Sequence, residues 1–112
     1  MKNLKILIYL FLVVTFVSAE FEQNLQLKLI LAEPGDTIKI DAGFFPILGT
    51  LSMEGKENIV IKGSGINSTI LSFASQVEGA QGISITNCNN ITLEDLTVED
   101  AKGDGIKCQY VD

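Results

Sequence analysis

The sequence predicts an all-β solenoid, a right-handed parallel β-helix of about two to three coils with a short amino-terminal capping helix. The main observation is a repeat, since residues 58–61 (Asn-Ile-Val-Ile) return 32 positions later as residues 90–93 (Asn-Ile-Thr-Leu). Residues 82–85 likewise return as residues 105–108, after 23 positions. Each copy alternates apolar and polar residues, which is typical of a half-buried strand. Repeats at this spacing indicate a solenoid, in which each repeat buries its apolar face against the next.

Residues 1–19 have the pattern of a secretory signal peptide. Lys2 and Lys5 give a basic start, residues 6–17 are a mainly apolar run, and the small residues before Glu20 offer a cleavage site. The apolar run is shorter than the ~20 residues that a membrane span needs, so an anchor is the less favoured interpretation. We therefore expect a protein that is secreted, periplasmic or at the cell surface, without membrane contact after cleavage.

The predicted mature chain is acidic. Cleavage removes Lys2 and Lys5 from the 8 basic residues, leaving 6 against 14 acidic ones, so the net charge becomes 6 − 14 = −8. The sequence contains no arginine and no histidine. This balance argues against nucleic acid as a partner. It also disfavours direct attraction to an acidic polymer, unless a bound cation mediates the contact.

Residues 20–35 are predicted to form an amino-terminal cap and turn. Apolar residues fall there at helical spacing, at Phe21, Leu25, Leu29 and Ala32. Pro34 and Gly35 then stop the segment. A strand is the alternative, because leucines also alternate at positions 25, 27, 29 and 31. A helix would cover the open strand edges at the start of the solenoid.

Residues 36–112 are predicted to form the coils. The first coil has three segments: a strand over residues 37–41, a turn over residues 43–46 and a strand over residues 51–53. The later coils use residues 58–61, 71–73 and 83–85, a polar loop over residues 74–81, and then residues 90–93, 96–98 and 105–108. Leu71 is aligned with Leu96, at 96 − 71 = 25 positions. The residues predicted to be buried are Ile59, Ile61, Leu71, Phe73, Ile83, Ile85, Ile91, Leu93, Leu96, Val98 and Ile106.

Two corner features follow from the alignment. Asn58 and Asn90 should stack at the same corner, where their amides can satisfy backbone groups of the turn. Cys108 aligns with Ile85, three residues from Cys88, which places the two cysteine Cα atoms roughly 10 Å apart and beyond bridging range. We interpret Cys108 as an inward core residue and Cys88 as a turn residue. A bend after Ile85 would leave a disulfide as the alternative.

Three segments carry a resemblance to a known family: residues 32–38 (Ala-Glu-Pro-Gly-Asp-Thr-Ile) followed by Gly43, residues 58–65 (Asn-Ile-Val-Ile-Lys-Gly-Ser-Gly) and residues 69–71 (Thr-Ile-Leu). This run resembles the opening of secreted right-handed parallel β-helix proteins of the pectate lyase-like superfamily. The resemblance covers nearly all of the mature chain and implies a polysaccharide-related role outside the cytoplasm. Lyases, epimerases, hydrolases and uncharacterised members share this opening.

Proteins of that superfamily usually have more coils. We therefore expect the chain to be the amino-terminal part of a longer protein, with the remaining coils as its partner. The full-length protein would then act on or bind an acidic polysaccharide, with lyase, epimerase or glycoside hydrolase chemistry, and this segment alone would be inactive. The alternative function is a non-catalytic extracellular or periplasmic β-helix that binds glycans or has a structural role.

Outward side chains on stacked strands are the candidates for a sugar-binding groove. One set is Ser52, Ser84 and Lys107, and a second set is Lys39, Ser72 and Thr97. From these we select three groove candidates: Ser84, Lys107 and Thr97. A solvated face without a ligand is the alternative for each.

An acidic cluster near the end of the chain contains Glu94, Asp95, Glu99, Asp100 and Asp104. Two such carboxylates could serve as acid and base in glycoside hydrolysis, and several could hold Ca²⁺, for which Asp100 and Asp104 are the candidates. The alternative is turn geometry, which favours Asp at corners. No catalytic residue is assigned, because proton abstraction beside a uronate carboxylate calls for a Lys or Arg base with a cation, and Lys107 stands alone here.

Overall fold

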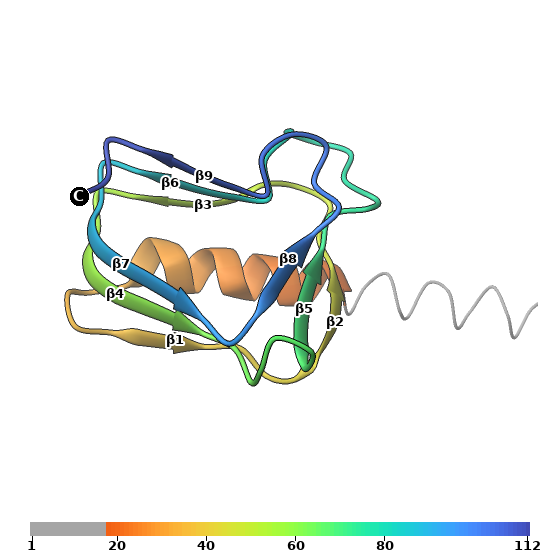
Figure 1. Cartoon of the computed structure of the whole chain (residues 1–112), viewed down its shortest axis with the longest axis horizontal. Coiled ribbons are helices and arrows are strands. Elements are labelled where there is room, and N and C mark those ends of the chain that lie inside the picture. The colour runs from red at the N-terminus through yellow and green to blue at the C-terminus, as the bar shows by residue number, and fades with distance from the viewer. Residues whose placement is uncertain (1–17) are drawn as a thin grey trace, which may run out of the picture.

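Nine short strands pair in three parallel sheets of three strands each within residues 18–112, which are the residues that the computed structural model describes (Figure 1). Sheet A contains β1 (Thr37–Lys39), β4 (Glu57–Lys62) and β7 (Asn89–Glu94). Sheet B contains β2 (Gly43–Pro46), β5 (Thr69–Ser72) and β8 (Thr97–Glu99). Sheet C contains β3 (Leu51–Glu54), β6 (Ile83–Thr86) and β9 (Ile106–Gln109). The signal peptide predicted for residues 1–19 lies almost wholly outside the described residues.

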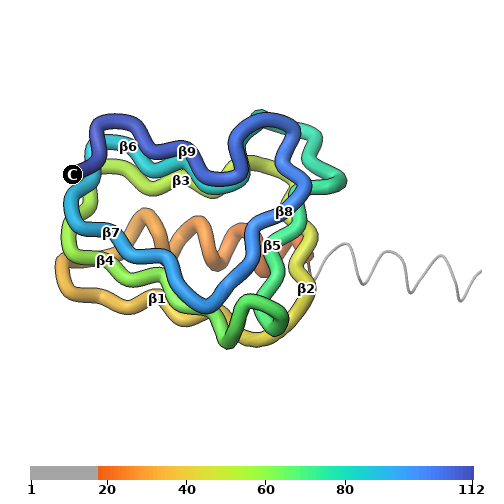
Figure 2. The backbone as a smooth tube through the Cα atoms, viewed as in Figure 1, coloured from red at the N-terminus to blue at the C-terminus, as the bar shows by residue number. Residues whose placement is uncertain are grey.

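The chain passes through sheets A, B and C in the same order three times. We call each passage a coil: coil 1 is β1–β3, coil 2 is β4–β6 and coil 3 is β7–β9. Figure 2 shows the three coils lying over one another. Parallel strands stacked in this way are consistent with the predicted β-helix. The register confirms the two main repeats, since Ile59 lies opposite Ile91 and Ile83 lies opposite Ile106.

One predicted alignment is wrong by two residues. Leu71 lies opposite Val98, at 98 − 71 = 27 positions, and not opposite Leu96. The corner between sheets A and B occupies residues 63–68 in coil 2 but only residues 95–96 in coil 3, and the pairing places β8 two residues later than the alignment assumed. A shift of two residues leaves the same side chains facing the interior, and the alternating pattern therefore cannot detect it. Leu96 lies at the corner, over Gly63.

A second prediction is also wrong, because residues 43–46 form the strand β2 and not a turn. Gly43 and Pro46 are residues that usually mark turns. Here β2 pairs along its whole length with β5, and Phe45 lies opposite Leu71. Pro46 is compatible with the strand because β2 is an edge strand, on which one row of N–H groups has no strand partner.

A helix over residues 18–31 covers the amino-terminal end of the stack, which confirms the predicted helix over the alternative strand. In Figure 1 it crosses behind the opening that the three sheets enclose. Leu25 and Leu29 are buried in the same core cluster as the strand residues. The ring of Phe21 stacks on that of Phe45 at 3.8 Å between centroids. The helix thereby closes one end of the core.

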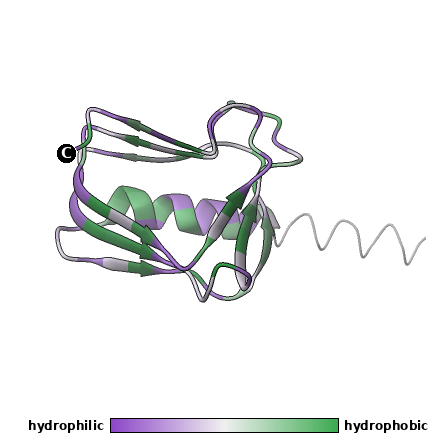
Figure 3. Ribbon diagram, in the orientation of Figure 1, coloured by the Kyte–Doolittle hydropathy of each residue, from purple (hydrophilic) through white to green (hydrophobic). Residues whose placement is uncertain are grey.

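The core lies between the three sheets and the helix, and hydrophobic residues recur in all of these elements (Figure 3). The inward residues of coils 1 and 2 are buried apart from the partly buried Phe45, and burial falls in coil 3. The predicted core residues of coil 2 are buried: Ile59, Ile61, Leu71, Phe73, Ile83 and Ile85. Those of β7, its following corner and β8 are partly buried: Ile91, Leu93, Leu96 and Val98.

The prediction of burial fails on β9. Ile106 is 46% exposed and Cys108 is exposed, although both stand in register with buried residues of β6. Within the described residues, coil 3 is packed on one side only, so its side chains lack the second neighbour that burial requires. Cys88, predicted as a turn residue, lies at the corner before β7 but is buried, and its thiol contacts the backbone carbonyls of Met53 and Thr86. Both cysteines are free thiols.

Asparagine is the second residue of both β4 and β7, and the two asparagines stack on each other as predicted. Asn58 and Asn90 both have left-handed backbone, with φ of 55° and 56°. The side-chain amide of Asn90 donates a hydrogen bond to the amide oxygen of Asn58 at 2.8 Å. Asparagine tolerates this backbone conformation better than most residues, so the sequence fits a left-handed corner at this point of both coils.

Replacing Phe73 by alanine tests the core. The Phe73 ring is fully enclosed, so we expect Phe73→Ala to lower the free energy of unfolding by about 3–5 kcal/mol. Val77→Ala is the matched control, because Val77 is 74% exposed in the loop after β5 and should change stability by less than about 0.5 kcal/mol. Urea unfolding measures both, and equal losses in the two variants would contradict this core.

Candidate functional site

The outer face of sheet C carries two rows of polar side chains. One row contains Ser52, Ser84 and Lys107, which lie opposite one another in β3, β6 and β9. This row confirms the first predicted set. The second row contains Glu54, Thr86 and Gln109. Neighbouring strands of a sheet are ~4.8 Å apart, so each row presents hydroxyl, amide or charged groups at that interval.

Thr97 does not join this face. It lies in β8 of sheet B, opposite Ile70, and its hydroxyl donates a hydrogen bond to the carbonyl of Ile66. The second predicted set is therefore wrong as a row, because Lys39 lies opposite Lys62 and Ser72 lies opposite Glu99. Of the three groove candidates, the structure brings Ser84 and Lys107 together and places Thr97 on another sheet.

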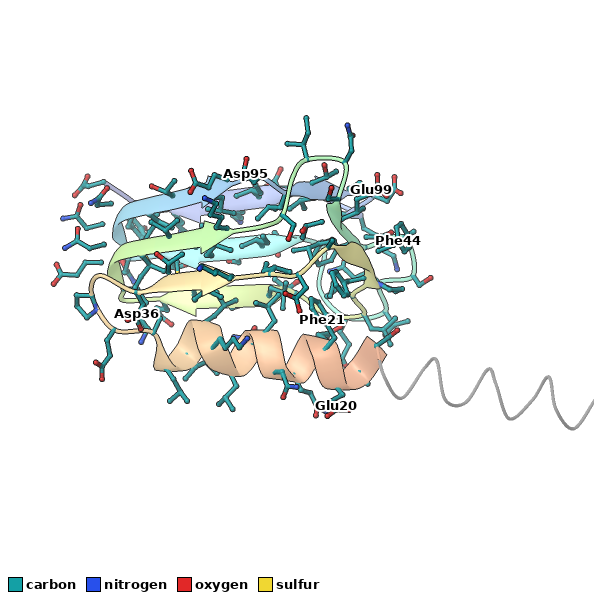
Figure 4. The ribbon with its side chains drawn as sticks, turned by 90° about the horizontal axis from the view of Figure 1, so that it is seen from below. Glu20, Phe21, Asp36, Phe44, Asp95 and Glu99 are labelled. Carbon is teal, nitrogen blue, oxygen red and sulfur yellow. The ribbon has the colours of Figure 1, made fainter. Side chains whose placement is uncertain are left out.

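The acidic cluster is spread over the corners of coil 3. Asp95 and Asp100 have left-handed backbone, with φ of 58° and 61°, which is the turn geometry that the sequence left open as their alternative role. Figure 4 shows Asp95 and Glu99 apart from each other at the end of the stack opposite the helix. Among residues 18–112, no three His, Cys, Asp or Glu side chains come close enough together to hold a metal ion. Ca²⁺ binding by Asp100 and Asp104 stays a prediction.

A row of lysines on the outer face of sheet A was missed by the sequence reasoning. Lys39 in β1 lies opposite Lys62 in β4, and Lys62 lies opposite Glu94 in β7. The repeat of 32 positions already aligns Lys62 with Glu94. The position of Lys39 could not be derived, because β1 precedes the repeat and its register with β4 is set by pairing in space.

Side-chain hydrogen bonds join the helix to coil 1, and two of them satisfy backbone groups on the free edge of sheet C. The Gln26 amide accepts a hydrogen bond from Ser52 N–H at 2.9 Å and donates one to Ser52 C=O at 2.8 Å. Glu22 accepts a hydrogen bond from the backbone N–H of Leu48 at 2.6 Å. Lys56 Nζ donates to the carbonyls of Ile30 and Ala32 at the carboxyl end of the helix. These contacts hold the helix along the β3 side of coil 1.

The described part of the chain has no helix that is both long and apolar enough to cross a membrane. Comparisons with protein-family models, with curated proteins and with solved structures gave no match. The geometry of the faces and edges therefore carries the functional argument.

Removing the Gln26 amide tests how the edge of sheet C is satisfied. Gln26→Ala takes away two hydrogen bonds to β3, and we expect a loss of about 1–3 kcal/mol in the free energy of unfolding. Gln23→Ala is the control, because Gln23 is an exposed residue of the same helix. Equal stabilities of the two variants in urea unfolding would contradict the proposed role of Gln26.

Proposed function

We propose that this chain is a right-handed parallel β-helix of the pectate lyase-like kind, and that it binds an acidic polysaccharide outside the cytoplasm along the outer face of sheet C. The observation that carries the proposal is the row formed by Ser52, Ser84 and Lys107. Three parallel sheets that the chain visits in the same order in each coil support the fold assignment, and the resemblance of residues 32–71 supports the substrate class.

The polar rows suit an extended glycan. Hydroxyl groups both donate and accept hydrogen bonds, as sugar hydroxyls do, and the Gln109 amide offers a donor and an acceptor beside them. Lys107 adds a point charge that can pair with a uronate carboxylate. Because each row places one polar side chain on every strand, a linear polymer lying across β3, β6 and β9 would meet a polar group at each strand spacing.

Binding explains this face better than catalysis. Among the outward strand residues of sheet C, Glu54 is the one carboxylate and Lys107 the one cation. Acid–base hydrolysis of a glycosidic bond uses two carboxylates that flank the bond. We therefore assign binding to this surface and no bond cleavage.

The acidity of the chain calls for a cation in the complex. With 14 acidic residues against 8 basic ones in the whole sequence, an acidic polymer is repelled over most of the surface. Ca²⁺ held by Asp100 and Asp104, and completed by carboxylates of the polymer, would reverse that repulsion locally. Oxygen ligands of this kind are those that Ca²⁺ prefers.

Replacing Lys107 tests the binding face. We expect Lys107→Gln to weaken binding of an oligogalacturonate about 5- to 10-fold, because one ion pair with a carboxylate is lost. Lys102→Gln is the matched control, since Lys102 is exposed in the loop before β9, away from the sheet. Isothermal titration calorimetry measures both affinities, and an equal effect of the two substitutions would show that the sheet C face is not the binding surface.

Calcium dependence is a separate test. We expect Ca²⁺ to strengthen oligogalacturonate binding to the wild-type chain, and Asp100→Asn combined with Asp104→Asn to abolish that gain. Asp41→Asn is the control, because Asp41 is an exposed carboxylate in coil 1. A calcium effect that survives in the double variant would remove Asp100 and Asp104 from the proposal.

A further inference from the structure

Coil 1 has three free strand edges, and two of them are partly blocked. Ser52 on β3 has both backbone groups bound by the Gln26 amide. At β2, the N–H of Gly43 donates to the carbonyl of Ser68 just before β5, and the N–H of Ile47 donates to the carbonyl of Ser72 in β5. The alternate residues Phe44 and Pro46 therefore face the free side. Pro46 has no N–H to offer there, which is a common protection of edge strands.

The edge of β1 has no such protection. Val60 N–H donates to Asp36 C=O and Ile40 N–H donates to Lys62 C=O, so the bonds to β4 come from every second residue of this segment. The alternation leaves the N–H and C=O groups of Thr37 and Lys39 on the side away from β4. Within residues 18–112 no hydrogen bond engages those four groups. β1 therefore presents an open template for another strand.

A groove of about 440 Å³ lies between this edge and the helix. Leu27, Lys28, Leu31 and Ala32 line it from the helix, and residues 36–39 line it from β1. Leu27 and Leu31 are 52% and 65% exposed, so the wall on the helix side is apolar and unpartnered. Figure 4 shows the helix running along this end of the stack, with Asp36 near one end of the helix and Phe21 near the other.

The charges around the groove are mostly positive, against the balance of the whole chain. Lys28 and Lys39 line the groove, and Lys62 lies opposite Lys39 on the adjoining strand. These are three of the six lysines in residues 20–112. In the described residues their ammonium groups have no hydrogen bond or ion pair, whereas Lys56 is bound to the helix end. The Asp36 carboxylate already accepts a hydrogen bond from the backbone N–H of Glu33.

We propose that the free edge of β1 binds an extended acidic segment of a partner protein, which adds to sheet A as a further strand. Its backbone would pair with Thr37 and Lys39, an acidic side chain would lie beside Lys39 and Lys28, and apolar side chains would contact Leu27 and Leu31. Strand addition of this kind takes its affinity from main-chain hydrogen bonds and its specificity from alternate side chains. The site is separate from the sheet C face that is proposed to bind polysaccharide.

Two other occupants fit less well. A second copy of this chain would bring its own Lys28, Lys39 and Lys62 against the same residues, and like charges in adjacent strands repel. A polysaccharide could pair with the lysines but has no regular row of N–H and C=O groups to match the edge of β1. The combination of an open backbone edge, an apolar wall and lysines therefore favours an acidic peptide.

The test uses a synthetic acetylated heptapeptide of alternating glutamate and valine, titrated into the protein. We expect binding that shifts the amide signals of Thr37 and Lys39 in NMR spectra and slows their hydrogen exchange. A twin peptide with lysine in place of glutamate should bind at least about 10-fold more weakly. Equal affinity for the twin, or shifts confined to β7–β9 at the other end of the stack, would overturn the proposal.

Thr37→Pro is the sharpest variant, because it removes an edge N–H that makes no bond to β4 and leaves every lysine in place. We expect it to weaken binding of the acidic peptide about 10-fold, while Thr37→Val, which keeps the N–H, binds within about 2-fold of wild type. Unchanged binding by a folded Thr37→Pro variant would overturn strand addition. If that variant does not fold, the hydrogen-exchange rates of the Thr37 and Lys39 amides in the wild type provide the test. Rates that the peptide leaves unchanged would also overturn strand addition.

Three further measurements separate the occupants. Lys39→Gln combined with Lys62→Gln should weaken peptide binding and reduce its dependence on salt. An oligogalacturonate that shifts the Thr37 and Lys39 signals and binds the folded Thr37→Pro variant as well as the wild type would assign this edge to polysaccharide instead. A dimer of the wild-type chain that forms without peptide and protects the same amides would assign it to a second copy.

Discussion

Backbone pairing of each coil with the next is the interaction on which the rest of this structure depends. No coil encloses a core alone, so an inward side chain is buried only when a neighbour lies on each side of it. Ile61 shows this, since it stands between Ile38 and Leu93 and is 2% exposed. Its equivalent in coil 3, Leu93, has one such neighbour and is partly buried. Position in the stack thus decides burial among residues of the same type.

The same pairing leaves three free strand edges at the amino-terminal end, and these edges differ in how their backbone groups are protected. A side-chain amide from the helix occupies β3, a proline limits β2, and β1 stays open beside exposed leucines and lysines. An amide that satisfies both backbone groups of Ser52 acts as a short substitute for a neighbouring strand. The absence of an equivalent side chain at Thr37 and Lys39, within the described residues, is what gives that edge its binding potential.

Corners and faces have different chemical roles in this fold. The left-handed backbone of Asn58, Asn90, Asp95 and Asp100 ties these residues to turn geometry, so the acidic cluster of the sequence is partly a consequence of how the chain changes direction. Outward positions on the strands do not require left-handed backbone, so polar side chains of different types fit there. Rows such as Ser52, Ser84 and Lys107 are therefore the better place to look for recognition.

The sequence by itself determined the strand alternation, the repeats of 32 and 23 positions, the amino-terminal helix and the stacked asparagine corners, because each depends on local periodicity or on residues that suit a turn. The row of Ser84 and Lys107 followed from the same repeats. Only the tertiary structure decided the pairing of Leu71 with Val98, the strand at residues 43–46, the exposure of Ile106 and the place of Thr97. A shift of two residues preserves alternation, and burial or an open edge depends on which chain segment lies alongside in space, so local patterns cannot specify them.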